Sequence, residues 1–382
     1  MFTRRCVLFQ ADSFLTTADD VKKIYHSFIN YFLLLIIMKW PVINTEWLEK
    51  HYKTFLIAPF VVLLLSILVI AFTISSTGDF VHKGVSLSGG VSVTMQATSD
   101  LSTAQIEAGF REQFPNADAS VRRLQGDHTF VIEASDIAAD EQEAARMLEE
   151  HLQTTYNPLS LSTETTGPAL GDAFFEQTLK GIMLAFLWMG WVVYLYFGNR
   201  LSVKFLAALI ALICTILVTQ GILIGVSGLI ILFTILLIHL AAYLYLSVPS
   251  GAVILAAMST VVFTTAIINL LGMRLQTAGV AAFLMIIGYS VDTDILLSSR
   301  VLKTSEGTII SRIIGAFKTG VTMQFTTTVV TLVAYVATNS AVVEQIMLIL
   351  FIGMIGDIFF TWTMNAGILY WYAKRIGVKE RV

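Results

Sequence analysis

Long hydrophobic runs dominate the chain, and short polar segments separate most of them. A membrane-spanning helix needs about 20 mostly apolar residues. Eight runs meet or approach that length, and they cover residues 55–75, 179–197, 204–225, 228–247, 251–271, 276–298, 317–337 and 345–372. A further apolar run at 28–38 is too short to cross a bilayer. The pattern predicts a polytopic α-helical membrane protein with about eight transmembrane helices.

The polar stretch after the first run has the pattern of a separate domain. The predicted elements, in chain order, are a strand at 91–95, a helix at 102–114, strands at 121–124 and 129–133 around a Gly126-Asp127 turn, a helix at 138–154 and a strand from Leu159. The order β-α-β-β-α-β predicts an α+β ferredoxin-like domain. Many functions use that fold, so the fold alone does not decide the function.

Composition agrees with a membrane protein. The 382 residues are 56% hydrophobic and 13% charged, whereas soluble domains are about a quarter charged. Cys6 and Cys214 provide no disulfide framework. We find no nucleophile–base pair, metal-ligand spacing or phosphate loop, and no feature that favours nucleic acid. The sequence therefore predicts a protein that is not an enzyme and that uses no cofactor or metal.

Charge is distributed unevenly along the chain. Residues 79–178 contain 16 acidic and five basic side chains, and the remainder contains 11 acidic and 19 basic ones. Positive charge in short loops marks the cytoplasmic side of a membrane protein. With Lys50 and Lys53 on that side, the acidic domain is predicted to be extracytoplasmic and both termini cytoplasmic, in the plasma membrane. Arg274 is the one short-loop cation that falls outside.

The division of the chain follows from these patterns. Residues 1–37 lack the basic start and the small-residue cleavage site of a secretory signal. Because Met38-Lys39-Trp40-Pro41 resembles the start of a protein chain, we expect residues 1–37 to be an N-terminal extension. A short interfacial helix is the alternative. The predicted parts beyond it are 38–78 (N-terminus and first span), 79–178 (soluble domain), 179–373 (transmembrane bundle) and 374–382 (cytoplasmic tail).

Three carboxylates lie within the last apolar runs, where an ionised acid costs at least a few kcal/mol unless protein or water surrounds it. Asp292 and Asp294 lie near the end of the sixth run, and Asp357 lies near the middle of the eighth. All three are candidates for a proton relay, with Asp292 first. For Asp292 and Asp294, the alternative is an acid at the membrane interface that pairs with Arg300 or Lys303. For Asp357, the alternative is a structural hydrogen bond.

Small residues accompany these acids and indicate close helix packing. The candidate packing positions are Gly288, Tyr289 and Ser290 before Asp292, and Gly353 and Gly356 before Asp357. The seventh run has a stripe of threonines with Gln324, suited to hydrogen bonds between helices or to a proton path. Trp362 is expected as an interfacial anchor.

Five short motifs, spread over residues 38–376, resemble those of the SecD/SecF family of protein-export membrane proteins, especially archaeal SecF members. They are Gly288-Tyr289-Ser290-Val291-Asp292, Ser299-Arg300-Val301-Leu302, the segment 316–323 (AFKTGVTM), the segment 365–372 (NAGILYWY) and the segment 84–90 (GVSLSGG). The last resembles the family's entry to its external domain.

This resemblance implies a function in protein export. It implies SecD as the partner, within the resistance-nodulation-division superfamily, together with the SecYEG channel, the exported polypeptide and membrane lipid. In bacterial relatives, proton flow is thought to drive movements of external domains, and Asp292 matches the acid of the related motif in SecD. Alternatives are a stand-alone proton-driven exporter of small or lipidic molecules, or a non-conducting scaffold for SecD.

The chain departs from the family pattern at several positions. Bacterial members usually have Asn-Asp where this chain has Asp292-Thr293, often an Asp where it has Ser259-Thr260, and an Arg where it has Met323. A relay built from those groups is incomplete here. The family has six spans, so residues 198–247 are expected to be an inserted helical hairpin.

Overall fold

The computed structural model describes residues 45–378, except 99–100, 116, 125–127, 136, 139, 224 and 339. The predicted N-terminal extension, the Gly126-Asp127 turn and the last four residues of the predicted tail therefore lie outside the described residues. Within them, eight helices are long and apolar enough to cross a membrane, as predicted. They are α2 (Thr45–Thr77), α6 (Pro168–Phe197), α7 (Leu201–Thr219), α8 (Gly225–Leu246), α9 (Val248–Leu270), α10 (Thr277–Lys303), α11 (Ile309–Ala337) and α12 (Ala341–Phe360), which continues through a π-helical turn η1 (Thr361–Asn365) into α13 (Ala366–Arg375).

Several helices extend beyond the apolar runs that predicted them. Helix α6 begins at Pro168, in the first-turn position that suits proline because its missing N–H has no partner there anyway. Thus the last eleven residues of the predicted 79–178 domain form the first turns of a membrane helix. Hydropathy detects only the part of a helix that lies in lipid. It does not detect the polar turns at either end of the same helix.

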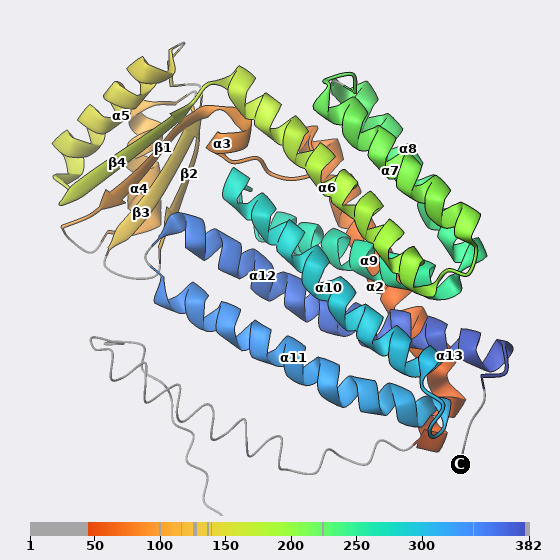
Figure 1. Ribbon diagram of the computed structural model, residues 1–382. Coiled ribbons are helices and arrows are strands. Elements are labelled where there is room, and N and C mark those ends of the chain that lie inside the picture. The colour runs from red at the N-terminus through yellow and green to blue at the C-terminus, as the bar shows by residue number, and fades with distance from the viewer. Residues whose placement is uncertain are drawn as a thin grey trace, which may run out of the picture. The chain divides into compact units, whose positions relative to one another are not determined.

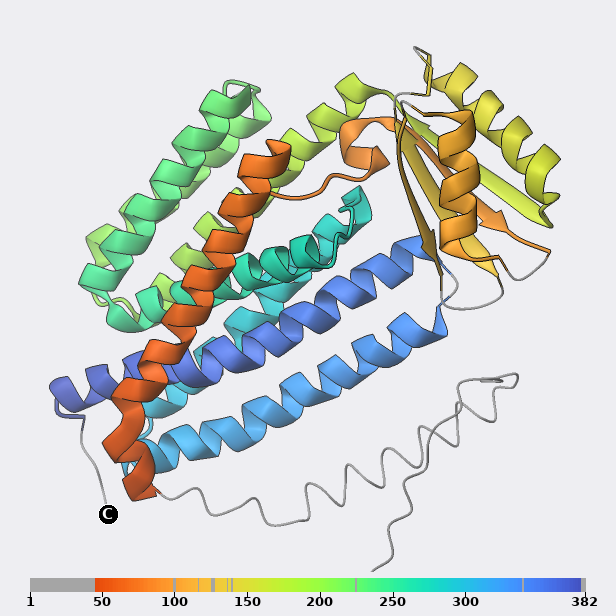
Figure 2. The ribbon, with the colours of Figure 1, turned by 180° about the vertical axis from the view of Figure 1, so that it is seen from behind.

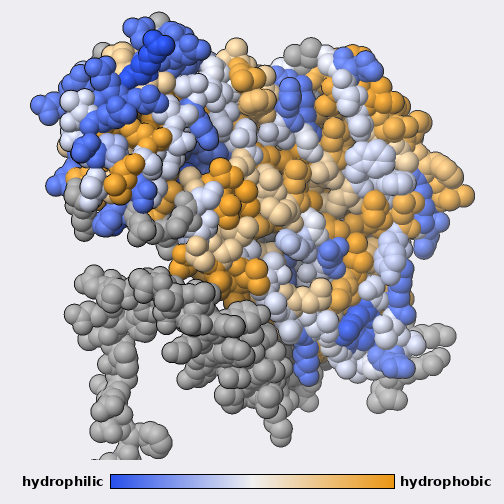
Figure 3. Space-filling view, turned by 60° about the vertical axis from the view of Figure 1, so that its left-hand side comes forward, coloured by the Kyte–Doolittle hydropathy of each residue, from blue (hydrophilic) through white to orange (hydrophobic). Residues whose placement is uncertain are grey.

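Three helices form the centre of the bundle. In its most apolar stretch, α9 is 67% buried, α10 56% and α12 50%, whereas α2, α7 and α11 are each 17% buried. Figures 1 and 2 show α9, α10 and α12 running between the outer helices. Figure 3 shows hydrophobic surface over the helices and hydrophilic surface over the small domain. Side chains of the central helices are thus shielded from lipid.

The small domain is a four-stranded antiparallel sheet with two helices. Its elements are β1 (Gly90–Gln96), α4 (Thr103–Gln113), β2 (Asp118–Arg123), β3 (Thr129–Ser135), α5 (Glu141–Tyr156) and β4 (Ser160–Thr166), in the sheet order β2-β3-β1-β4. This is the predicted order of strands and helices. A short helix α3 (Val85–Ser88) joins α2 to β1.

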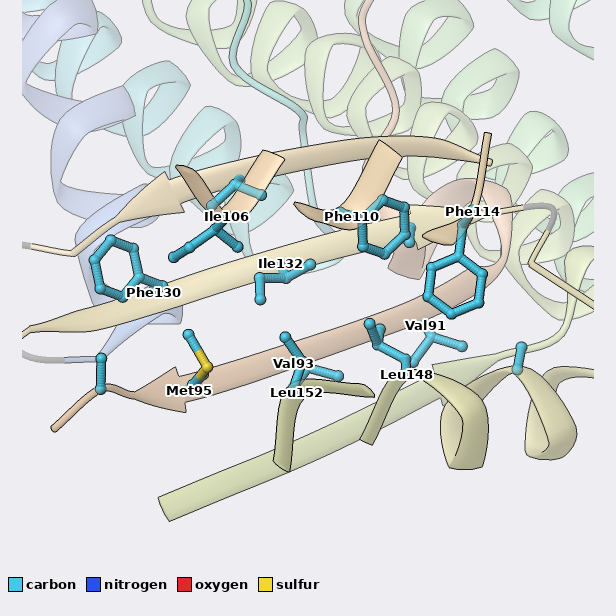
Figure 4. Packing of buried hydrophobic residues seen from close by; sticks show 14 residues of the cluster. Val91, Val93, Met95, Ile106, Phe110, Phe114, Phe130, Ile132, Leu148 and Leu152 are labelled. Carbon is cyan, nitrogen blue, oxygen red and sulfur yellow. The ribbon is translucent and has the colours of Figure 1, made fainter. Parts of the chain in front are cut away.

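The two helices of the domain cover the same face of the sheet. Val93 of β1 lies opposite Ile132 of β3, so both side chains point to one face, where they join Phe110 of α4 and Leu148 of α5 in a fully buried core (Figure 4). Helix α4 starts at a capping box in which the Ser102 side chain accepts the backbone N–H of Gln105. The other face of the sheet is polar.

The α7–α8 hairpin packs against α6 through polar contacts at both ends. The indole N–H of Trp188 donates to Thr215 Oγ1 at 3.0 Å, and Lys204 Nζ donates to the Leu195 carbonyl at 2.8 Å. At the domain end, Glu176 Oε1 accepts the Gly225 backbone N–H at 2.6 Å. These bonds fix the hairpin on α6 because no water competes for them in lipid.

One histidine makes the stability of the domain depend on pH. Burial lowers the pKa of His151 on α5 below its ordinary value of 6.5, and its ring lies edge-on to Phe114. The unfolded chain therefore binds this proton at a higher pH than the folded domain. As the pH falls through about 6.5, we expect the free energy of unfolding to decrease until the folded side chain also protonates.

Amide hydrogen exchange of α5 in the full chain, compared at each pH between the protein and His151→Gln, measures this effect. We expect the substitution to remove the loss of protection that the protein shows below pH 6.5. His128→Gln, in the turn before β3, is the matched control and should leave that loss in place. Equal pH dependence in the protein and in His151→Gln would contradict the assignment.

Candidate functional site

Two carboxyl groups lie together in the centre of the bundle. Asp294 on α10 and Asp357 on α12 are both fully buried, with 0% exposure, and the two groups interact electrostatically. They occupy α10 and α12, two of the three helices at the centre of the bundle. Because apolar helices surround them, neither acid can reach water by extending its side chain.

Amide and hydroxyl groups hold the two carboxyls in place. Asn365 Nδ2 donates to Asp294 Oδ1 at 2.7 Å. Gln324 Nε2 of α11 donates to Asp357 Oδ2, and the Thr361 hydroxyl donates to Asp357 Oδ1 at 3.3 Å. We call these five residues the carboxyl cluster. Donors aimed at a carboxyl compensate part of the free energy lost when it leaves water.

A single π-helical turn supplies three of the donors around the cluster. Thr361 begins η1, Asn365 ends it, and Trp362 between them donates its indole N–H to Gln324 Oε1 at 2.7 Å. The extra residue in a π turn rotates the side chains that follow, and such turns occur frequently at functional sites. Here it lets one helix contact both acids, one through Thr361 and the other through Asn365.

The cluster keeps unused hydrogen-bonding capacity. Two buried oxygen atoms of the cluster, Asp294 Oδ2 and Asn365 Oδ1, have no hydrogen-bond partner in the described part of the chain. None of the ion pairs formed by the described residues includes Asp294 or Asp357. A pair of buried acids without a cation, one of them with a free oxygen, is suited to bind a proton or a small polar species.

The structure places Asp292 differently from the prediction. Its side chain is exposed on the surface of the chain, not inside the bundle, whereas Asp294 is buried. Consecutive residues on an α-helix are about 100° apart, so positions 292 and 294 point to nearly opposite sides of α10. Arg300 donates to the Gly315 carbonyl at 2.8 Å and Lys303 to the Tyr196 carbonyl at 3.3 Å, so neither cation pairs with these acids.

Asp292 belongs to an exposed stripe on α10. Met285, Gly288, Tyr289 and Asp292 lie at helical spacing and are all exposed. An added Cβ at Gly288 would meet no atom within 4 Å. We call these four residues the α10 stripe. Gly288, predicted to admit a neighbouring helix, therefore admits none from the described part of this chain.

Of the other predicted packing positions, Gly353, Gly356 and Ser290 lie against neighbours, whereas Tyr289 does not. A Cβ added to Gly353 would overlap Ile286 Cδ1 of α10, and one at Gly356 would be 2.6 Å from Phe263 of α9. Ser290 is fully buried, and Tyr289 is 42% exposed. The glycines of α12 therefore bring α9, α10 and α12 close enough for the carboxyl cluster to form.

Sequence reasoning overlooked part of the cluster. Trp362 does not anchor the chain at an interface, because its indole donates to Gln324 and its ring lies against Gly320. Asn365 and Thr361 were not singled out, although the spacing of 357, 361 and 365 at four-residue intervals was a signal. In the threonine stripe, the Thr322, Thr326, Thr327 and Thr328 hydroxyls donate to backbone carbonyls of their own helix.

The positions at which the chain departs from the family pattern have ordinary structural explanations. Ser259 and Thr260 on α9 are buried, and each hydroxyl donates to the carbonyl four residues before it. Met323 is 50% exposed on α11. These positions therefore bring no charged group to the carboxyl cluster.

Comparison with known families identifies relatives of this chain. A family model described as "Protein export membrane protein SecD/SecF, C-terminal" matches residues 147–227 and 222–375. The protein-export membrane protein SecF of Methanothermobacter thermautotrophicus is 30% identical over 339 residues, covering 87% of this chain and 96% of that protein. SecF of Methanocaldococcus jannaschii is 28% identical over 337 residues, covering 87% of this chain and 99% of that protein.

A solved structure has the same fold. The crystal structure of SecDF from Thermus thermophilus, described as a translocon-associated membrane protein, superimposes with a TM-score of 0.53 at 16% identity. The match covers 85% of this chain but 38% of the SecDF chain. At this identity the likeness concerns the fold alone.

Proposed function

Because this chain belongs to the SecD/SecF family of protein-export membrane proteins, we propose that it is a SecF-like accessory subunit that acts with SecD to promote translocation of secreted proteins. Two lines of support are the relatives named SecF, matched over nearly their whole length, and the SecDF-like fold. The proposed role is mechanical, in the plasma membrane next to the SecYEG channel, without enzymatic chemistry or a cofactor.

We propose that the small domain is a ferredoxin-like sandwich outside the cytoplasm. Its sheet order and its two helices on one face support that fold. The excess of acidic residues in 79–178 supports the orientation, as do Arg300, Lys303 and Arg312 at the opposite end of the bundle. The exported polypeptide would then meet this domain after it leaves the channel.

The buried pair Asp294 and Asp357 is the observation that carries a proton-coupled mechanism. Holding two negative charges side by side in an apolar interior costs much free energy, so such a pair favours taking up a proton. Proton binding and release would change the repulsion between α10 and α12, which hold the two acids. We infer that the proton motive force acts here through Asp294 and Asp357.

A second candidate function is a scaffold that stabilises SecD without moving protons. It is favoured by Ser259, Thr260 and Met323, which stand where relatives often carry charged residues of the relay. Substitution of the buried acids distinguishes the two functions, because a scaffold needs the shape of these side chains and a relay needs their charge.

We propose that SecD covers the α10 stripe. Asp292 lies six residues, or about 9 Å, from the end of the apolar run 276–298, and an exposed carboxylate at that depth is costly against lipid. Gly288 leaves space for a close helix. A SecD helix with a basic or hydrogen-bond-donating group opposite Asp292 would satisfy both features.

Co-purification with SecD tests the proposed partnership. We expect Gly288→Leu to lower the amount of SecD recovered about tenfold, which is about 1.4 kcal/mol, because the larger side chain fills the space of the partner helix. Gly181→Leu on α6 is the matched control, since an added Cβ there also meets nothing within 4 Å. Equal recovery of SecD with both variants would show that SecD does not cover this face.

We propose that α7 and α8 are an addition to the six spans of the family. The two segments of the family match overlap at residues 222–227, from the connection between these helices into the first turn of α8. Two added crossings leave the orientation of all later helices unchanged. The hairpin therefore changes the outer surface of the bundle without altering α9, α10 and α12.

A further inference from the structure

The polar face of the sheet lies against the end of the bundle at which α10 and α12 begin (Figures 1 and 2). We call this contact the sheet–helix junction. It forms an open pocket of about 110 Å³ lined by both polar and apolar residues, among them Gln276 and Gln345 of the bundle. The sheet residues are Ser92, Thr94, Arg122, Val131, Glu133, Glu164 and Thr166. A pocket of that volume has room for several water molecules next to its polar groups.

Direct contacts across the junction are polar. Arg274, in the turn between α9 and α10, donates from Nη2 to both carboxylate oxygens of Asp118 on β2, each at 2.8 Å. Gln276 Nε2 donates to Glu133 Oε1 on β3 at 2.7 Å. Gln345 of α12 donates to the Arg274 carbonyl at 2.7 Å and accepts the Gln276 backbone N–H at 3.1 Å. The last two bonds lie within the bundle, and they tie the residues that contact the sheet to α12.

These contacts leave polar groups unsatisfied. Arg122 Nη2 lies 3.8 Å from Glu133 Oε1, beyond hydrogen-bond distance. Arg122 Nε and Glu133 Oε2 are buried and have no partner in the part of the chain that the structure describes. Water in the pocket is the natural partner for both. Breaking a hydrated, polar contact changes the free energy little, because bulk water then satisfies the same polar groups.

The attachment of α3 lies beside the junction and is apolar and close-packed. Leu87 of α3 is fully buried, in one cluster with Val280 and with Leu275, which lies between Arg274 and Gln276 in the chain. An added Cβ at Gly171 of α6 would be 2.7 Å from the Gly89 backbone nitrogen. Gly89 follows α3 and Gly90 is the first residue of β1, with φ angles of +87° and +124°, which favour glycine. This attachment is a compact joint next to two conformationally permissive residues.

We propose that the sheet–helix junction is a releasable latch and that Gly89 and Gly90 are its hinge. In the latched state, Arg274 and Gln276 hold the sheet on the ends of α10 and α12. In the released state, the domain rotates about the hinge and water replaces these contacts, while the apolar joint of α3 and α6 stays closed. The Gln276 side chain links both parts, since its Oε1 accepts the Ser86 backbone N–H at 3.0 Å. This explains why the cation Arg274 lies at the domain end of the bundle.

Distance measurements between spin labels test the latch in the full chain, reconstituted in lipid nanodiscs. One label replaces the exposed Glu112 on α4 and the other replaces Leu271 at the end of α9. We expect a single narrow distance in the otherwise unchanged protein. Asp118→Arg alone, or Arg274→Asp alone, places like charges together and should shift the distribution to longer, broader distances. The double variant Asp118→Arg/Arg274→Asp should restore the narrow distance.

Two controls keep the result specific. Arg146→Asp makes the same charge reversal on the exposed surface of α5 and should leave the distance unchanged. A label pair at Glu112 and Glu149, both within the domain, should keep its distance in every variant. If the single reversals leave the junction distance unchanged, or the double variant fails to restore it, the latch is wrong. A change in the distance within the domain would also overturn it, because the junction would then be part of the domain's own fold. No export assay enters these measurements, so they are independent of the proposed function.

Discussion

Export in cells that rely on this chain is expected to fall about tenfold or more when Asp357 is replaced by Asn, and similarly for Asp294→Asn. Asparagine has nearly the shape of aspartate and still accepts hydrogen bonds from Gln324 or Asn365, but it cannot take up or release a proton. A buried acid that serves as a proton carrier should therefore lose its function while the bundle keeps its packing. The measurement is secretion of a reporter protein at equal abundance of the complex, over a series of imposed membrane potentials.

The exposed acid provides the matched control for this experiment. Asp292→Asn removes the same charge only two residues from Asp294, yet on the surface of α10. We expect it to preserve the response of export to membrane potential, although it can reduce the amount of SecD bound. If Asp294→Asn and Asp357→Asn both leave export and its potential dependence intact, the proton mechanism fails and the scaffold function is supported.

Replacement of Gly353 by Leu is expected to destabilise the chain itself, by about 1–3 kcal/mol. Its Cβ would overlap Ile286 Cδ1 and lie 2.7 Å from Ile286 Cγ1, and Ile286 is fully buried on α10. The new side chain must push α10 and α12 apart and so separate Asp294 from Asp357. Thermal unfolding in detergent, followed by the fraction of monodisperse protein that remains, should show a midpoint several degrees lower.

Gly288→Leu is the comparison that isolates the cause. It adds the same side chain to the same class of membrane helix, but at a position where an added Cβ meets no atom within 4 Å. In the absence of SecD we expect its midpoint to match that of the protein. Leucine has a higher helix propensity than glycine, so propensity alone predicts no loss of stability in either variant. An equal loss in Gly288→Leu and Gly353→Leu would therefore contradict the contact with Ile286 as the cause.

The helix packing at Gly353 and Gly356 also affects the sheet–helix junction. Gln276 begins the turn into α10 and Gln345 belongs to the first turns of α12, and the Gln276 N–H donates to the Gln345 side chain. A change in the separation of these helices, caused by Gly353→Leu or by protonation, would act directly on the residues that hold the sheet. The packing of the bundle and the position of the domain are therefore expected to change together.

Much of the architecture is determined by the sequence alone. Apolar length predicted eight spans because a helix in lipid must satisfy its backbone internally over the thickness of the bilayer. Alternation in Val91–Met95 and the helical spacing of Ile106 and Phe110 predicted the strands and helices of the domain, because water on one side and a core on the other impose strong periodicity. The sequence also showed directly that acidic residues lie in the last spans.

Only the tertiary structure decided which acid lies inside. Asp292 and Asp294 are two residues apart on one helix, and the residues around them are apolar, small or hydroxylic on both sides of α10. Lipid and the protein interior are both apolar, so the two faces of a membrane helix differ little in sequence. Which face is buried therefore cannot be predicted from such a difference. Likewise, the π turn that brings Thr361 and Asn365 to the two acids follows from how α12 packs against α9, α10 and α11. Local sequence specifies that helices form; the neighbours that each side chain meets arise from packing.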